Sequence, residues 1–248
     1  MSLVALLLLF LVQQNCATKD EQEHGCPSSS CGKITNITYP FRLKGDPKSC
    51  GHNRYELACE NNVTALYLYS GKYHVQAINY DNFTVRVVDP GLQQQNYSSL
   101  PRYFLSRSNF TDTYSYYYPT DPYQAGLDRR RNWDDLAFQH VVFMNCSHPV
   151  TYNRKYVDTD SKGYYIYAIA GDLKARDFEV GCHVKLVALT SWWGFDTNNS
   201  SYTAMHTGLL YGFEISWIRL ACENHCRYGF WCNFDSSSRE LQCRPYGE

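Results

Sequence analysis

The sequence predicts a mainly β, disulfide-rich fold with antiparallel strands and a few short helices. Tyr, Phe and Trp make up 16% of the 248 residues, and aromatic side chains favour strands over helices. Short runs of aromatic and β-branched residues alternate with two-residue turn candidates. The chain also contains 11 cysteines, an odd number whose explanation lies at the N-terminus.

The N-terminal segment is typical of a secretory signal peptide. Residues 3–12 (LVALLLLFLV) are all apolar and are followed by a small-residue site and a charged stretch. A helix of that length is too short for a hydrocarbon core of about 30 Å, but it fits the apolar region of a signal. We interpret residues 1–17 as cleaved after Ala17, the alternative being a buried N-terminal helix. No second apolar stretch approaches the length of a membrane helix, so we expect a mature protein without an anchor.

Cleavage leaves an even set of cysteines, because Cys16 departs with the signal. An even set in an oxidising compartment predicts five disulfides, whose connectivity the spacing leaves open. The ten residues are Cys26, Cys31, Cys50, Cys59, Cys146, Cys182, Cys222, Cys226, Cys232 and Cys243. The last four, with His225 among them, could instead form a metal site, but their spacing favours disulfides over zinc. We expect no metal and no cofactor.

Eight N-x-[ST] tripeptides support the same compartment. Each is a candidate N-glycosylation site and is expected on the surface, since a glycan cannot be buried. The asparagines are Asn36, Asn62, Asn82, Asn96, Asn109, Asn145, Asn198 and Asn199.

The distribution of the cysteines predicts two modules. Four fall within residues 26–59, none between 60 and 145, and six follow. We place the first module at 26–105, a connecting segment at 106–139 and a cysteine-rich C-terminal module at 140–248. The connecting segment is rich in Ser, Asp, Tyr and Pro and has no sustained hydrophobic period.

Both modules show strand patterns. In the first, ALYLYS, YHVQAINY and FTVRVVD are separated by the turn candidates Gly71-Lys72 and Asp81-Asn82, which predicts an antiparallel meander. In the second, QHVVFMNC, GYYIYAIA and GCHVKLVALTSWW are strand candidates. The stretch LLYGFEISWI alternates only in part and could be a short helix leading into a strand.

Composition and motifs exclude several functions. With 23 Lys and Arg against 24 Asp and Glu, the chain has no overall charge suited to nucleic acid. Hydrolase, zinc-protease and nucleotide-binding motifs are absent from the sequence. The candidate acids Asp134-Asp135, Glu179 and Glu214 show no sign of a catalytic pair, and the first two follow the basic residues 129–131. We therefore expect no enzyme.

Two aromatic clusters are candidates for stacking against sugar rings. They are Trp192-Trp193 and the segment from Tyr114 to Tyr118. The more common role of such residues in β proteins is to fill cores and cover disulfides. The sequence leaves both interpretations open.

A family resemblance rests on the spacing of several residue types in the first module. The residues are Cys31-Gly32-Lys33-Ile34, residues 37–43 (ITYPFRL), Cys50-Gly51, residues 55–59 (YELAC) and the continuation YHVQAINYDNFTVRVVDP. Over about 26–105 they resemble the galacturonan-binding domain of plant wall-associated receptor kinases. Cys182-His183, residues 212–217 (GFEISW) and the last four cysteines resemble the C-terminal module of leaf-rust-resistance-type receptor-like kinases.

The chain departs from that family pattern in two respects. Residues 227–231 (RYGFW) stand where the family usually has a double-glycine turn. A transmembrane helix and a kinase domain, which typical members carry, do not follow. We therefore expect an isolated ectodomain, secreted to the cell wall, or membrane-associated if the chain is a fragment of a longer receptor with a role in plant defence.

The resemblance implies binding of an acidic polysaccharide, pectin or an oligogalacturonide. Carboxylates of such a polymer are best met by Arg and Lys. Candidate contacts are Arg42, Lys44, Lys48, Arg54, Lys72 and Arg86, each of which could instead be an ordinary surface charge. A second hypothesis is a receptor-type or decoy ectodomain that recognises a protein or peptide, such as a co-receptor, and a third is a wall-modifying hydrolase.

Overall fold

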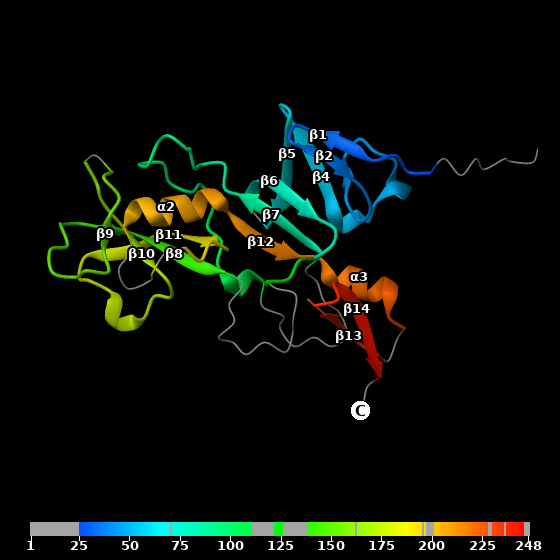
Figure 1. Cartoon of the computed structure of the whole chain (residues 1–248). Helices are drawn as coiled ribbons and strands as arrows, with labels where there is room; N and C mark the ends of the chain where they lie inside the picture. Colours follow the sequence, from blue (N-terminus) through cyan, green and yellow to red (C-terminus); the bar gives the residue numbers. More distant parts are fainter. Residues whose placement is uncertain are drawn as a thin grey trace, which may run out of the picture.

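The computed structural model confirms the mainly β, antiparallel class with a few short helices (Figure 1). The structure describes residues 25–69, 71–110, 122–125, 138–161, 163–194, 196, 201–227, 230–235 and 237–245. The signal segment and Cys16 lie outside these ranges.

The first sheet has six strands in the order β12-β7-β6-β5-β4-β3. Only the β3–β4 pair is parallel, and the other neighbours run antiparallel. A short hairpin of β1 and β2 accompanies the sheet. The strands are β1 (Ser29–Cys31), β2 (Ile34–Ile37), β3 (Arg42–Leu43), β4 (Glu56–Glu60), β5 (Val63–Leu68), β6 (Gly71–Asn79), β7 (Thr84–Val88) and β12 (Phe213–Ser216).

The predicted meander is confirmed in β5, β6 and β7, but one turn lies elsewhere. Leu68 pairs with Gly71, so Gly71 and Lys72 belong to β6 and not to the turn. Tyr69, at φ 52°, takes the left-handed conformation instead. Asp81 and Asn82 do lie in the loop between β6 and β7, which pair as far as Asn79 and Thr84.

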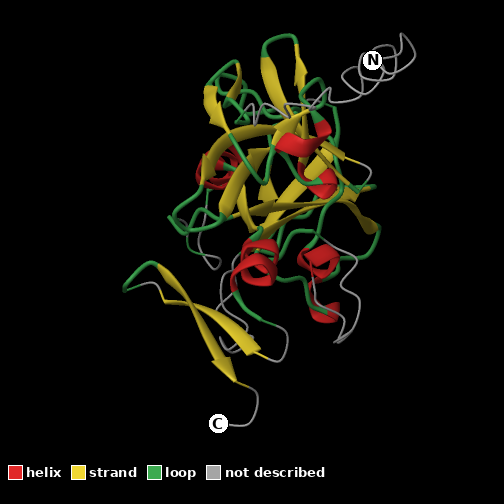
Figure 2. Cartoon of the chain, turned by 90° about the vertical axis from the view of Figure 1, so that its right-hand side faces the viewer, coloured by secondary structure: helices red, strands yellow, loops and turns green. Residues whose placement is uncertain are grey.

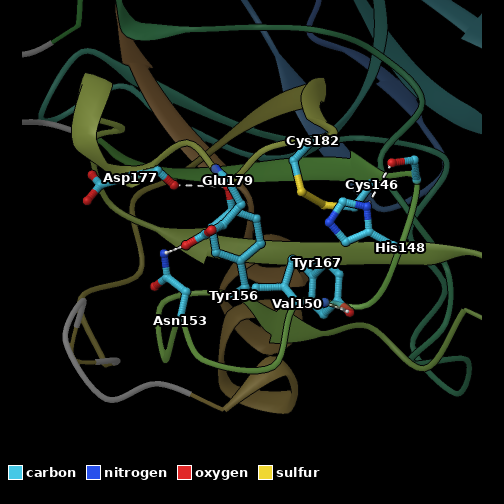
Figure 3. Close-up of a disulfide and its surroundings, with 10 residues drawn as sticks. Cys146, His148, Val150, Asn153, Tyr156, Tyr167, Asp177, Glu179 and Cys182 are labelled. Carbon is cyan, nitrogen blue, oxygen red and sulfur yellow. Dashed lines mark hydrogen bonds between the residues drawn. A yellow bond between two sulfur atoms is a disulfide. The ribbon is translucent and has the colours of Figure 1, made fainter.

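The second sheet has the order β11-β8-β10-β9, and all its strands run antiparallel. Its strands are β8 (Gln139–Cys146), β9 (Val157–Asp158), β10 (Tyr165–Ala170) and β11 (Cys182–Thr190). Helix α2 (Tyr202–Tyr211) packs on one face through Met205 and Leu209. The other face packs against Tyr156, whose ring contacts Tyr167 beside the Cys146–Cys182 disulfide (Figure 3).

Strand β12 joins the two halves of the chain. It pairs with β7 along its whole length, from Phe213 opposite Val87 to Ser216 opposite Thr84. The first core also takes up Trp217 and Leu220 from the C-terminal half. Residues assigned to the C-terminal module thus complete the sheet of the first, while the boundaries at 105 and 140 stay predictions.

The remaining helical elements are short. Helix α3 (Ile218–His225) follows β12, and the hairpin of β13 (Phe230–Asp235) and β14 (Glu240–Pro245) stands out from the body near the C-terminus (Figure 2). The described residues also contain four single-turn helices, η1 (Lys48–Cys50), η2 (Asn53–Tyr55), η3 (Arg107–Phe110) and η4 (Ala175–Asp177). None of the helices in the described ranges has the length and apolar character needed to cross a membrane.

Five disulfides confirm the predicted number and settle the connectivity. In the first half Cys26 pairs with Cys50 and Cys31 with Cys59. Cys146 and Cys182 link β8 to β11 at positions that face each other in the register. The last four cysteines pair Cys222 with Cys232 and Cys226 with Cys243, which ties α3 to the terminal hairpin. Each bond therefore reinforces one local unit.

Gly212 is expected to be essential for the turn from α2 into β12. Its φ is 86°, and a Cβ at this position would overlap the carbonyl oxygen of Val87. We expect Gly212→Ala to lower the free energy of unfolding by at least about 2 kcal/mol. Gly45→Ala is the matched control, because no atom lies within 4 Å of its Cβ position. Equal denaturation midpoints for the two variants would contradict this assignment.

Candidate functional site

Arg42 is the one candidate cation that the structure buries. Its side chain forms an ion pair with Glu56, across the parallel β3–β4 pair, and the residue is 5% exposed. Gly51 packs directly on its aliphatic part, because a Cβ there would approach the Arg42 Cβ to 2.7 Å. The burial argues against the expected ligand contact and gives Arg42 a structural role between β3 and β4.

Lys72 lies at the centre of a polar group on the solvent side of the first sheet. Its Nζ donates to Glu60 Oε2 at 2.8 Å, and the Tyr67 hydroxyl donates to Glu60 Oε1 at 2.5 Å. These hydrogen bonds, from Lys72 first and then Tyr67, lower the pKa of Glu60, and the charge of Lys44 acts in the same direction. The hydrogen bond to Glu60 in turn raises the pKa of Lys72. Lys72 therefore contacts this carboxylate directly, and Lys44 acts on it through its charge.

His74 extends this group along β6. Lys72 and His74 alternate with Tyr73 and Val75, which face the first core. Partial burial is the main cause that lowers the pKa of His74, the charges of Lys72 and Arg102 lower it further, and Asp89 opposes them. The charges of two cations from separate segments thus act on one imidazole. We call Lys44, Glu60, Tyr67, Lys72, His74 and Arg102 the outer-face cluster.

Asp89 fixes the position of Arg102. Its Oδ1 accepts hydrogen bonds from the amides of Gly91 at 2.7 Å and Arg102 at 2.8 Å, and its Oδ2 accepts from the amide of Tyr103 at 2.9 Å. The carboxylate is buried, so these three donors replace its hydration. The loop that follows β7 is thereby folded back beside β6. Sequence reasoning missed Arg102 because only this loop closure brings it to the sheet.

Lys48 and Arg54 occupy a different part of the domain. Both are exposed on the segment of η1 and η2, which the Cys26–Cys50 disulfide anchors. The charges of Arg54 and of Arg219 in α3 both act on the buried hydroxyl of Tyr55. Helix α3 therefore adds a cation to this side of the domain. Local sequence patterns do not reveal Arg219 as a neighbour, because it lies far along the chain from Lys48 and Arg54.

Arg86 is separate from both groups and packs on Tyr211 at the end of α2. Its Cζ lies 4.6 Å from the centre of the Tyr211 ring. The structure therefore divides the six candidates into a buried residue, two members of the outer-face cluster, two exposed cations near η1 and η2, and Arg86.

The two candidate acids within the described ranges, Glu179 and Glu214, have separate partners. Glu179 accepts a hydrogen bond from the Asn153 side chain beside the second sheet (Figure 3). Glu214 on β12 accepts from the Tyr211 hydroxyl. Asp134-Asp135, the basic residues 129–131 and the Tyr114–Tyr118 cluster lie outside the described residues. In the part of the chain that the structure describes, no group of three His, Cys, Asp or Glu could hold a metal ion.

None of the six sequon asparagines within the described ranges is buried. At Asn82, Oδ1 accepts from the hydroxyl of Thr84, the last residue of its own tripeptide, at 2.6 Å. Asn198 and Asn199 lie outside the described residues. Glycosylation at these sites stays a prediction, with which their exposure is compatible.

The pKa of His74 tests whether the charges of Lys72 and Arg102 act together on the outer face. Its pKa should lie below the ordinary value of about 6.5, because burial, Lys72 and Arg102 all disfavour the imidazolium. Lys72→Gln and Arg102→Gln should each raise it, as measured by NMR of the ring protons. Lys48→Gln removes an exposed charge elsewhere and should leave it unchanged. An identical His74 pKa in all four proteins would show that the cluster does not exist.

Comparison with known proteins shows what the first part of the chain is similar to. Residues 26–89 match the model of the wall-associated receptor kinase galacturonan-binding family. This range holds β1 to β7 and every member of the outer-face cluster except Arg102. No solved structure matches the chain.

Three curated relatives from Arabidopsis thaliana are leaf rust 10 disease-resistance locus receptor-like protein kinase-like proteins. Protein 2.5 is 26% identical over 163 residues, which are 62% of this chain and 23% of that protein. Protein 2.1 is 30% identical over 36% of this chain, which corresponds to 14% of that protein. Protein 2.8 is 24% identical over 93% of this chain, which corresponds to 25% of that protein. The chain thus spans about a quarter or less of their length. Residues 26–89 are thus similar to the wall-associated receptor kinase galacturonan-binding family, and the chain is similar to a part of these receptor-like protein kinases.

Proposed function

We propose that the chain binds the acidic polysaccharide of the plant cell wall, pectin or its oligogalacturonides, through the outer-face cluster. The observation that carries the proposal is the hydrogen-bonded group of Lys72, Glu60 and Tyr67 on the outer face of β4, β5 and β6. The charge of Lys44 also acts on Glu60, and that of Arg102 acts on His74. The family match over 26–89 supports the choice of ligand, since the matching model is described as galacturonan-binding.

The chemistry of the cluster suits a polyuronate. Each sugar unit carries a carboxylate, and ammonium and guanidinium groups on a sheet face can meet successive carboxylates with charge-assisted hydrogen bonds. Tyr67 is 59% exposed beside Lys72 and offers a ring against which a sugar can pack. A net charge of -1 for the chain is no obstacle, because local cations determine where a polyanion binds.

Glu60 sets the strength of this binding. In the free protein it holds Lys72 by an ion pair, so a uronate must compete with an internal carboxylate for the same ammonium group. The ion pair is solvent-exposed and weak enough to exchange. Glu60 therefore keeps Lys72 in place and moderates the affinity for acidic sugars.

We expect opposite effects from the two partners of this ion pair. Lys72→Gln should weaken binding to oligogalacturonides about two- to fivefold, and Glu60→Gln should strengthen it, because Lys72 is released from its internal partner. Isothermal titration calorimetry of the secreted protein measures both. Lys185→Gln is the matched control, since it removes an exposed cation from the second sheet.

Salt dependence provides the second readout of the same experiment. Binding by the wild type should weaken as salt is added, because screening shortens the range of exposed charges. The dependence should be shallower for Lys72→Gln and unchanged for Lys185→Gln. Equal affinity at low and high salt, or the same affinity for all the variants, would refute binding of galacturonan by the outer-face cluster.

The disulfides and the family match also support an extracellular location. Five disulfides and the extracellular receptor-like family fit an extracellular location. We propose the cell wall as its site, as the ligand requires. We also propose that the chain itself performs no catalysis, because Glu179 and Glu214 are engaged with separate partners.

A second candidate function is recognition of a protein or peptide, favoured by aromatic residues exposed around the second sheet. Tyr152 is 99% exposed and Tyr164 is 70% exposed, and Phe178 is also exposed. Exposed aromatic side chains are enriched at protein interfaces. These residues lie in loops at or beside β9, β10 and β11, outside the galacturonan-binding domain.

Panning of a displayed peptide library tests this second candidate. Peptides enriched on the wild type should lose binding to the double variant Tyr152→Ala, Phe178→Ala, which leaves the first sheet untouched. Galacturonan affinity should be the same in both proteins. Equal peptide enrichment on the wild type and the double variant would exclude this surface as the recognition site.

A further inference from the structure

A second polar and aromatic group lies at the edge of the first sheet formed by β12, which follows α2 and pairs with β7 (Figure 1). Arg86 on β7 stacks on the Tyr211 ring, and its Nη1 donates to the Tyr211 carbonyl oxygen at 2.8 Å. The Tyr211 hydroxyl donates to Glu214 Oε1 at 2.7 Å. Arg86 and Glu214 are paired in the register of β7 and β12. The group therefore combines one cation with one anion around an aromatic ring.

Trp192 extends this group toward solvent. Its ring centre lies 5.5 Å from that of Tyr211, and its amide donates to the hydroxyl of the buried Thr190 at 3.0 Å. Gly194 lies against the nitrogen edge of the indole, where a Cβ would overlap it. Contacts on two sides therefore hold the indole in one orientation. The side chain is nevertheless 39% exposed.

Trp193 adds a second exposed indole, with 55% of its surface open to solvent. Neither tryptophan belongs to the three hydrophobic cores formed by the described residues, whereas Trp217 is 5% exposed in the first core. Core filling, the usual role of such residues, therefore does not explain Trp192 or Trp193. Exposed apolar surface bordered by fixed polar groups is typical of ligand sites.

We infer that Trp192, Trp193, Tyr211, Arg86 and Glu214 form a binding site for a neutral pyranose sugar. The C–H face of a pyranose ring packs on an indole, and its hydroxyl groups need both donors and acceptors. Arg86 supplies donors and Glu214 supplies acceptors. The balanced charge selects against a uronate, whose carboxylate would be repelled by Glu214.

This site goes beyond galacturonan binding and is distinct from it. The outer-face cluster recognises charge, so salt should weaken its binding. The tryptophan site relies on ring stacking and uncharged hydroxyl groups, and its binding should be nearly independent of salt. The two activities can therefore be separated in a single protein.

Calorimetric titration with neutral oligosaccharides tests the inference. The full secreted protein is titrated with β-1,4-linked gluco-, xylo- and galacto-oligosaccharides at about 0.05 M and about 0.5 M NaCl, before and after enzymatic removal of its own N-glycans. We expect at least one neutral oligosaccharide to bind equally at both salt concentrations. Trp192→Ala should weaken that binding at least about fivefold, while binding of oligogalacturonides should be unchanged.

Two further variants and one control keep the test decisive. Trp193→Ala removes an exposed indole and leaves the contact between Trp192 and Tyr211 intact. Glu214→Gln removes the negative charge and keeps the side chain nearly the same shape. Both variants should weaken neutral-sugar binding. Tyr152→Ala removes an exposed aromatic residue from the second sheet and should have no effect. Absence of binding by every neutral oligosaccharide, or wild-type affinity in Trp192→Ala and Trp193→Ala, would overturn the inference.

Discussion

The pairing of β12 with β7 is the constraint on which the rest of the structure depends. It brings four residues from the C-terminal half of the chain into the first sheet, whose other strands lie within residues 26–89. Without β12, the backbone groups of β7 would form an open edge. The same connection places α3 against the first core through Trp217 and Leu220, and it places Tyr211 over Arg86. Both candidate sugar sites therefore belong to a sheet that neither half completes alone.

On this sheet, the outer face and the β12 edge offer different chemistry. On the outer face, Lys72 binds Glu60, the charges of Lys44 and Arg102 act on Glu60 and His74 respectively, and cations predominate. At the other, Arg86 and Glu214 balance each other beside exposed indole rings. Asp89 and Gly212 position the backbone at these two sites. The Asp89 carboxylate holds the loop that carries Arg102, and the positive φ of Gly212 allows the turn from Tyr211 into β12.

Local patterns in the sequence predicted most of the strands and the number of disulfides. Strand alternation depends only on neighbouring residues, and the number of disulfides follows from a count of the cysteines. The strands around Val85 and Phe143 and the presence of five disulfides were predictable on those grounds. The β7–β12 pairing, the burial of Arg42 and the attachment of the Arg102 loop to Asp89 depend on contacts between distant segments, which no local pattern records. Gly71 was misplaced because glycine favours turns, but its lack of a side chain also suits a strand crowded by the Tyr73 and Tyr103 rings.

Hydrogen exchange of the full chain with and without an oligogalacturonide tests the central claim most directly, namely that the outer face of the first sheet binds the acidic polymer. Bound sugar should slow amide exchange in β5, β6 and the loop around Arg102, which surround the outer-face cluster. Exchange in β8 to β11 should stay the same. Protection confined to the second sheet, or no protection at saturating oligogalacturonide, would contradict the account.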